Sequence, residues 1–237
     1  MAEIRINQLC KSFLVAGQRQ MVLTGVDLTL PMAQITVVLG KSGCGKTTLL
    51  RILGGLESWD SGSIDVPPGV RLGMVFQEAR LMPWLTVAQN IAFSTGKKQP
   101  PQWAEPWLER VGLAGYGGAY PAQLSGGMQQ RVALARALAY EPEWLLMDEP
   151  FSALDHFTRE AMQQELRAIQ RREQKGVLLV THSIDEALIL GDQIVLLQDG
   201  RVSHQYDLHA WNGDRDLLSP QAIAWKKQIL EHLKEQM

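Results

Sequence analysis

A glycine-rich octet carries the clearest chemical signal in the sequence. It reads Gly40-Lys41-Ser42-Gly43-Cys44-Gly45-Lys46-Thr47 and fits the pattern G-x-x-x-x-G-K-[ST]. Because glycines have no Cβ, their backbone N–H groups can converge on phosphate oxygens, and a helix that starts here adds its positive end. Lys46 would reach the β- and γ-phosphates of a nucleotide, and the Thr47 hydroxyl would ligate Mg²⁺. Residues 40–48, Thr48 included, are therefore predicted to bind ATP with Mg²⁺.

One of the two cysteines lies inside this octet. Cys44 sits among the backbone amides and near a lysine, and such a positive field can lower the pKa of a thiol. The alternative is that the position only needs a small residue. On the first interpretation, alkylation of Cys44 would block nucleotide binding, and bound ATP would protect the thiol. Cys10 belongs to no Cys/His cluster, so a zinc site is not expected.

Polar residues that could act on a phosphate follow two later apolar runs. Asp148 ends the run 144–147, and an aspartate at the carboxyl end of a buried strand can hold a Mg²⁺ water beside the octet. The next residue, Glu149, could act as general base on the attacking water. His182 follows the run 177–181, at the end of a parallel sheet where ligands bind in open α/β folds. It could hydrogen-bond the γ-phosphate, or be a surface or capping histidine.

The apolar pattern places these residues on an α/β core. Val26, Leu28 and Leu30 alternate as in a half-buried strand, whereas 35–39 is a continuous run typical of a strand covered on both faces. A helix at 47–53 follows the octet, which gives the strand, glycine loop and helix that the motif requires. Further strands are expected at 71–77, 144–147, 177–181, 193–197 and 201–204, the last two joined by an Asp199-Gly200 turn, and further helices at 125–139, 159–175 and 184–190.

The apolar runs and the glycine and proline breaks divide the chain into three kinds of segment. Residues 1–77 and 141–205 are predicted to form the nucleotide-binding core, whereas glycine and proline breaks between 78 and 140 indicate a mainly helical insert. A C-terminal tail, 206–237, is expected to hold a helix that starts at Ser219-Pro220. Its apolar face would dock on the core or bind a partner; this face comprises Ile223, Ile229, Leu230 and Leu233.

Composition excludes several classes of protein. The chain has 237 residues, 46% of them apolar and 20% charged, and a formal net charge of -2, as in a soluble globular protein. This balance supplies no basic field for nucleic acid. The N-terminus lacks the apolar region of a signal peptide, and no stretch approaches the roughly 20 apolar residues that span a bilayer. Any action at a membrane would therefore need a partner that spans it.

A second octet, Leu124-Ser125-Gly126-Gly127-Met128-Gln129-Gln130-Arg131, resembles the signature of ABC-transporter ATPases. Its physical logic is a second anion cradle, built from backbone amides and a serine hydroxyl at a helix N-terminus. The resemblance covers essentially the whole chain. It implies one domain, 1–237, with a P-loop NTPase (RecA-like) core, an antiparallel β subdomain and an inserted helical subdomain. It also implies ATP hydrolysis between two head-to-tail copies, with each ATP held by one P-loop and by Ser125, Gly126 and Gly127 of the other copy.

The resemblance assigns further roles. Phe13 is similar to the aromatic residue that stacks on adenine, although it could be a core phenylalanine. Gln77 is similar to the glutamine that touches Mg²⁺ or water and senses the membrane partner, and His182 to the switch histidine. The loop 152–155 resembles the one by which each site contacts its twin. Two departures are expected to be local: Met128 stands where glutamine is commonest in the signature, and Met32-Ala33 stands where glycine is usual.

Within the family, segments 73–78 and 81–87 resemble the importers for nitrate, aliphatic sulfonates and taurine and their thiamine-precursor relatives. Pro83-Trp84 would then lie where a membrane subunit docks, unless Trp84 is an ordinary packing residue. The implied partners are a second copy of the chain, multispanning permease subunits and, indirectly, a periplasmic or surface solute-binding protein, with no nucleic acid. The implied location is peripheral, at the cytoplasmic face of the inner membrane.

Three other classes of protein within the family are the alternatives to an importer subunit, and the sequence argues against each. An ATPase that acts on DNA would need a long coiled coil between the octet and the signature, and the interval from Thr47 to Leu124 is short and lacks heptads. A translation factor would carry two cassettes, and this chain has one. An ATPase that serves iron–sulfur assembly fits the size, but the segment 81–87 argues against it.

Overall fold

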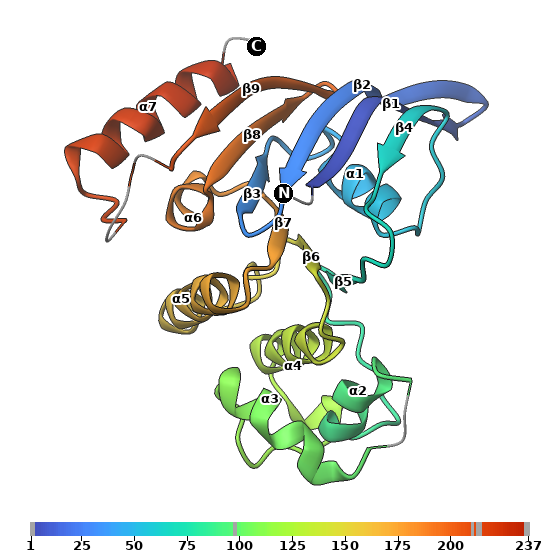
Figure 1. Ribbon diagram of the computed structural model, residues 1–237, viewed down its shortest axis with the longest axis vertical. Helices are drawn as coiled ribbons and strands as arrows, with labels where there is room; N and C mark the ends of the chain where they lie inside the picture. Colours follow the sequence, from blue (N-terminus) through green and yellow to red (C-terminus); the bar gives the residue numbers. More distant parts are fainter. Residues whose placement is uncertain (1–2, 97–98, 210, 212–214, 235–237) are drawn as a thin grey trace.

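Two sheets form the centre of the fold in the computed structural model, which describes residues 3–96, 99–209, 211 and 215–234 (Figure 1). The larger sheet has six strands in the order β5-β6-β7-β3-β8-β9. Its neighbours pair in parallel, except β8 and β9, which are antiparallel. Its strands are β3 (Ile35–Leu39), β5 (Leu72–Val75), β6 (Trp144–Asp148), β7 (Gly176–Thr181), β8 (Gln193–Gln198) and β9 (Arg201–Asp207).

The central strands are buried on both faces. Every residue of β3, β6 and β7 is buried. In β3, Ile35, Val37 and Leu39 pack into one hydrophobic cluster and Val38 packs into the other. A strand covered on both faces exposes no polar side, which is why its sequence is a continuous apolar run. The strands predicted from these runs are confirmed.

A three-stranded antiparallel sheet, ordered β2-β1-β4, covers one side of the core. It consists of β1 (Glu3–Val15), β2 (Gln18–Pro31) and β4 (Ser61–Asp65). Helix α1 (Lys46–Leu53) packs between the sheets, because its Leu49 and Leu50 share a cluster with residues of both. The sequence did not predict β4, in which Ile64 is the only residue that is not exposed. Backbone pairing with β1 defines this strand instead of an apolar pattern.

Between β5 and β6, the regular elements of the described residues are all helical, and they form the lower lobe in Figure 1. Helix α2 starts with a capping box, in which Thr86 Oγ1 accepts from Gln89 N and the Gln89 side chain accepts from Thr86 N. These elements fall within the predicted insert at 78–140. They are α2 (Val87–Phe93), η1 (Pro101–Ala104), α3 (Glu105–Arg110), η2 (Pro121–Gln123) and α4 (Gly126–Ala139).

Three more helices complete the fold: α5 (His156–Glu173), α6 (Ile184–Leu190) and α7 (Pro220–Lys234). Helix α5 starts earlier than predicted because the Asp155 side chain caps it, accepting from Thr158 N at 3.1 Å. Helix α7 starts as predicted, with Ser219 Oγ accepting from Ala222 N at 3.2 Å. Of the predicted apolar face, Ile229 is buried and Leu233 packs against the core, whereas Ile223 and Leu230 are exposed. The face as a whole therefore does not dock on the core, and Ala222 is the other buried position.

The turn between β8 and β9 reaches back to β2. Asp199 and Gly200 have φ values of 46° and 73°, as the predicted Asp-Gly hairpin turn requires. Thr24 N donates to the Gly200 carbonyl at 2.8 Å. A Cβ on Gly200 would lie 2.4 Å from the carbonyl oxygen of Val22. Only glycine therefore lets this turn pack against β2.

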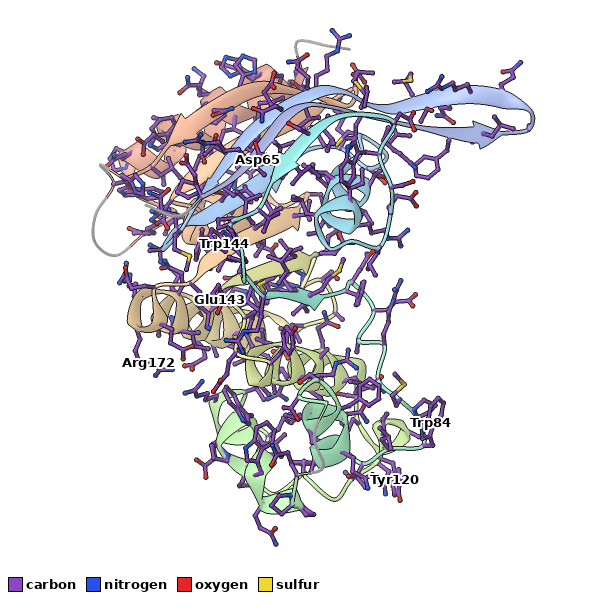
Figure 2. The ribbon with its side chains drawn as sticks, turned by 45° about the vertical axis from the view of Figure 1, so that its right-hand side comes forward. Asp65, Trp84, Tyr120, Glu143, Trp144 and Arg172 are labelled. Atoms are coloured by element: carbon purple, nitrogen blue, oxygen red, sulfur yellow. The ribbon has the colours of Figure 1, made fainter. Side chains whose placement is uncertain are left out.

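We predict that Gly176→Ala destabilises the fold. Gly176 pairs with Trp144 across β7 and β6, and an added Cβ would lie 2.0 Å from Trp144 Nε1 (Trp144 is labelled in Figure 2). A buried ring must then move, which we expect to cost about 1–3 kcal/mol of unfolding free energy. Denaturant titration of the nucleotide-free protein measures it. Gly118→Ala is the control, because its Cβ would meet nothing within 4 Å; equal midpoints for the two variants would contradict the packing argument.

Candidate functional site

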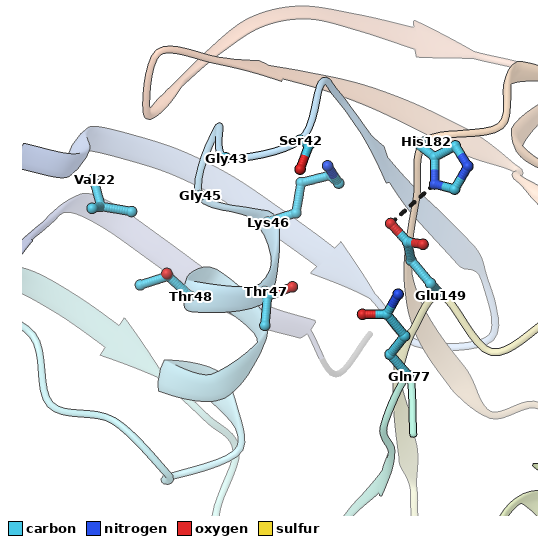
Figure 3. Close-up of a pocket in the computed structure, with 10 residues that line it drawn as sticks. All are labelled: Val22, Ser42, Gly43, Gly45, Lys46, Thr47, Thr48, Gln77, Glu149 and His182. Atoms are coloured by element: carbon cyan, nitrogen blue, oxygen red, sulfur yellow. Dashed lines mark ion pairs between the residues drawn. The ribbon is translucent and has the colours of Figure 1, made fainter. Parts of the chain in front are cut away.

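A cavity of about 560 Å³ opens where the carboxyl ends of the parallel strands face the start of α1 (Figure 3). Segments that are far apart in the sequence meet there: the glycine loop after β3, Gln77 after β5, Glu149 after β6 and His182 after β7. This edge of an open parallel sheet is where α/β folds bind their ligands. The cavity is lined by Val22, Ser42, Gly43, Gly45, Lys46, Thr47, Thr48, Gln77, Glu149 and His182.

Two glycines of the loop have no room for a side chain. A Cβ on Gly40 would lie 2.3 Å from the Leu197 carbonyl oxygen, and one on Gly45 would lie 2.7 Å from Leu23 Cδ2. Gly45 also has a φ of 106°, which side chains disfavour. The loop is thus held against β2 and β8 with its backbone bare. Bare backbone amides at a helix start are the donors that a phosphate group needs.

The Lys46 ammonium is buried in this loop and bonded to neutral groups. Its Nζ donates to the carbonyl oxygens of Gly40 and Lys41, both at 2.8 Å. Among the described residues, no carboxylate lies within ion-pair distance of Lys46. A buried cation without a counter-charge is costly. An anion in the cavity would compensate it, so the loop fits a nucleotide phosphate.

Thr47 and Asp148 are paired below the loop. The Thr47 hydroxyl donates to Asp148 Oδ1 at 3.0 Å. Burial raises the pKa of the Asp148 carboxyl above its ordinary value, the Thr47 hydrogen bond opposes this rise, and the neighbouring Glu149 carboxylate adds to it. Asp148 lies behind the cavity wall, whereas Gln77 is exposed on it. Hydroxyl, carboxylate and amide oxygens are the ligands that Mg²⁺ takes, so the predicted metal set fits the ion.

Glu149 and His182 are paired on one side of the cavity, opposite the glycine loop. Glu149 Oε1 and His182 Nδ1 are 3.0 Å apart, as the dashed line in Figure 3 marks. Glu149 has a φ of 44°, a left-handed conformation that costs a glutamate on the order of 1–3 kcal/mol. The amide of Glu149 bonds to the Val180 carbonyl at 2.9 Å, and its carbonyl accepts from Ser152 N at 3.2 Å. The backbone is therefore fixed at a turn that aims this carboxylate into the cavity.

Other predicted residues lie outside the cavity wall. Phe13, on β1, is half-buried, and the Lys11 ammonium lies 4.7 Å from the centre of its ring. Lys41 is exposed, and Gly40 and Cys44 form the loop without lining the cavity. The prediction of a lowered thiol pKa is wrong. Burial raises the pKa of the Cys44 thiol, and the nearby charge of Lys46 only partly offsets the rise.

The signature octet lies away from the cavity. Ser125 caps α4, where its hydroxyl accepts from Met128 N at 3.3 Å, and Ser125 and Gly126 are both exposed. Gly127 packs against the loop 152–155: a Cβ there would lie 3.2 Å from Leu154 Cδ2. The amide-rich start of α4 therefore faces solvent, and one chain does not bring its signature and its glycine loop to a common cavity.

Sequence reasoning missed Val22 on the cavity wall. Val22 belongs to β2, and its carbonyl excludes a side chain at Gly200 and, together with Leu23, at Gly45. No motif marks it, because its position follows from the packing of β2 across the glycine loop.

Known proteins resemble this chain over most of its length. The ABC transporter family profile matches residues 23–152. The uncharacterized ABC transporter ATP-binding protein MJ0412 of Methanocaldococcus jannaschii is 42% identical over 99% of this chain and 92% of its own length. The aliphatic sulfonates import ATP-binding protein SsuB of Bacillus subtilis is 41% identical over 95% and 92%. The SsuB 1 protein of Pseudomonas syringae pv. syringae is 46% identical over 90% of each chain.

Solved structures agree with these matches. The dimeric post-hydrolysis state of the ATP-binding cassette MJ0796, bound to ADP and Pi, has a TM-score of 0.80 and 30% identity, covering 86% of this chain and 98% of that chain. A second dimeric structure of MJ0796, a bacterial ABC transporter cassette, has a TM-score of 0.79 and 31% identity, with the same coverage. The predicted α/β P-loop fold is confirmed.

We predict that Asp148→Asn stabilises the nucleotide-free protein at about pH 7. A carboxyl whose pKa is higher in the folded chain than in the unfolded chain costs stability once it is ionised, and asparagine removes that charge. The gain should vanish as the pH falls through the folded pKa of Asp148, because the native carboxyl then binds a proton. Thermal unfolding between about pH 7 and pH 4 measures it.

The control for this prediction is Asp155→Asn, for which the sign is opposite. The hydrogen bond from Thr158 lowers the pKa of Asp155, so its ionised form contributes stability that is present at neutral pH and lost as the pH falls through its folded pKa. Asparagine keeps the helix cap but removes the charge. A loss of stability at neutral pH in both variants would contradict the argument.

Proposed function

The chain belongs to the ABC transporter ATPases, and from this membership we propose that it is the ATP-binding subunit of an importer for a small solute. Aliphatic sulfonates, taurine, nitrate and thiamine precursors are the candidate solutes. Relatives named as aliphatic sulfonate importers, at 41% and 46% identity over at least nine-tenths of the chain, support the sulfonate class. The observation that carries the ATPase site itself is the cavity that gathers the glycine loop, Glu149 and His182.

In the proposed site, ATP lies along the glycine loop. Lys46 would exchange its bonds to the Gly40 and Lys41 carbonyls for the β- and γ-phosphates, because a phosphate supplies the charge that those carbonyls lack. Residues 40–48 would cradle the phosphates, and Phe13 would contact adenine. Thr47, Gln77 and Asp148 would hold Mg²⁺, which when bound neutralises charge on the phosphate oxygens.

Catalysis in this proposal consists of positioning and charge stabilisation. The Glu149 carboxylate accepts the proton of the attacking water. Its fixed backbone and its contact with His182 hold this carboxylate in place. His182, exposed at the cavity rim, donates toward the γ-phosphate once a nucleotide is present. Phosphoryl transfer leaves little covalent chemistry to the protein, so these placements and the Lys46 charge supply most of the acceleration.

Two copies would complete each site. Within one chain Ser125 and Gly126 of the signature face solvent, and the MJ0796 cassettes of the same fold are dimeric. We therefore infer a head-to-tail pair in which Ser125, Gly126 and Gly127 of one copy bind the γ-phosphate held by the other. Hydrolysis removes the group that joins the copies, and they separate. A membrane partner would convert this opening into alternating access.

The helical lobe offers a surface for that partner. Trp84 is 71% exposed, and Figure 2 shows it at the edge of the lobe, near Tyr120. Trp84 is therefore not a packing aromatic, which favours its assignment to a surface where a multispanning permease docks. Within the described ranges, no helix has the length and apolarity for a membrane crossing. The chain would lie at the cytoplasmic face of the inner membrane and depend only indirectly on a solute-binding protein.

Co-purification of the chain with a detergent-extracted multispanning membrane protein tests the proposed permease partner. Co-purification only with soluble proteins would favour an ATPase that serves iron–sulfur assembly.

We predict that Glu149→Gln binds ATP and hydrolyses it at least about tenfold more slowly, because the amide cannot take up the proton of the water. The variant should accumulate as an ATP-bound dimer. Phosphate release and size-exclusion chromatography with ATP measure the two effects. Normal turnover would remove Glu149 from its role.

We predict that Ser125→Arg keeps nucleotide binding but loses hydrolysis, because the cradle it disturbs belongs to the other copy's site. A mixing experiment makes the prediction sharper. Lys46→Ala alone should also be inactive, yet a mixture of the two variants should hydrolyse ATP, since one of the two sites in a mixed dimer then keeps both halves. Absence of activity in the mixture, with each variant folded, would argue against the shared site.

A further inference from the structure

An arginine on the first turns of α5 holds the loop 152–155 by its backbone. Arg159 Nη2 donates to the Leu154 carbonyl at 2.7 Å, and its Nε donates to the Phe151 carbonyl at 3.3 Å. A guanidinium is a rigid fork, so it fixes the spacing of the two carbonyls in a way that an ammonium does not. Gly127 packs against this loop, because a Cβ added to it would lie 3.2 Å from Leu154 Cδ2 and 3.5 Å from the Ala153 carbonyl oxygen. The position of the loop therefore also depends on the start of α4.

A buried glutamate links the same arginine to the two neighbours of His182. Glu186 Oε1 is 4.0 Å from Arg159 Nε, and its Oε2 accepts from the Thr181 hydroxyl at 2.6 Å. Thr181 Oγ1 in turn accepts from Ser183 N at 3.1 Å, and Ser183 Oγ accepts from Glu186 N at 3.3 Å. The residues immediately before and after His182 are thus both tied to Glu186.

The network closes on the cavity side. Ser152 donates from its N and its Oγ to the Glu149 carbonyl, at 3.2 and 3.0 Å, and Glu149 lies 3.0 Å from His182. The contacts therefore run from Glu149 through the loop to Arg159, and from there through Glu186 and Thr181 to His182. Burial of the Glu186 carboxylate costs free energy. The cap of α6 does not require this carboxylate, because the Ser183 side chain supplies the cap.

We infer that Arg159 and Glu186 are positioning residues that make the placement of His182 depend on the loop 152–155, and through Leu154 on the signature segment. The inference rests on the proposed function, because it assigns His182 to the reaction and the signature to the other site. A signature that engages the other copy's nucleotide would move Leu154, Arg159 would carry that shift to Glu186, and Glu186 would set His182 in its own site. The two sites would thereby be coupled within each chain.

Arg159→Lys and Glu186→Gln are the variants that test this inference. Lysine keeps the charge but loses the fork, and glutamine keeps an acceptor for Thr181 but loses the charge. We expect each to lower kcat of the dimer about three- to thirtyfold, with KM for ATP and the melting temperature of the nucleotide-free chain close to native. Arg171→Lys and Glu160→Gln, exposed on the same helix, are the matched controls and should leave all three values unchanged.

The decisive measurement adds Arg159→Lys to a His182→Ala chain, with hydrolysis followed in single turnovers. If Arg159 acts through His182, the second change costs less than about twofold in the variant background. A full additional loss there, an unchanged kcat in the single variants, or a loss that only parallels the melting temperature would overturn the inference. Normal turnover by Glu149→Gln and His182→Ala themselves would instead refute the proposed function, so the two failures are distinguishable.

Discussion

The buried ammonium of Lys46, on the cavity wall, and the buried carboxylate of Asp148, which bonds to the wall residue Thr47, do not form an ion pair. Lys46 bonds to two carbonyl oxygens, and Asp148 to one hydroxyl. Each charge gives up hydration and receives only neutral partners, which costs free energy in the empty protein. A phosphate chain carrying a divalent cation presents the opposite charge to both. The cavity therefore suits a ligand that carries both charges. The two unpaired charges lower the stability of the empty chain and strengthen the binding of such a ligand.

Close backbone packing shapes the phosphate loop that carries Lys46. Gly40 and Gly45 must lack side chains because Leu197, Leu23 and Val22 occupy the space that a Cβ would take. The parallel strands then deliver Gln77, Asp148, Glu149 and His182 to the same edge, since Asp148 is the last residue of β6 and the other three follow the carboxyl ends of strands. The antiparallel sheet has no part in this convergence, but it supplies Val22 to the cavity wall.

The sequence predicted those parts of the fold that are dictated by burial on both faces or by motif context. Strands β3, β6 and β7 are continuous apolar runs, and the octet needs its strand and helix, so these elements were predictable. Strand β4 was not, because pairing with β1 rather than an apolar pattern defines it. The thiol pKa of Cys44 was mispredicted because near neighbours in the sequence reveal charge but not burial. Which side of α7 docks depends on packing that a single sequence does not contain, so the predicted face includes Ile223 and Leu230, which are exposed.

The contact of the β8–β9 turn with β2 widens the set of positions on which the site depends. Gly200 lies at a hairpin tip, yet the atom nearest to its missing side chain is the Val22 carbonyl, which also borders Gly45. A bulky replacement at the tip would press on the same strand that backs the phosphate loop. Mutational tolerance around this turn should thus resemble that of the ligand pocket, and a survey of variants would score a buried glycine at a hairpin tip, remote from the ligand, among the poorly replaceable residues of the chain.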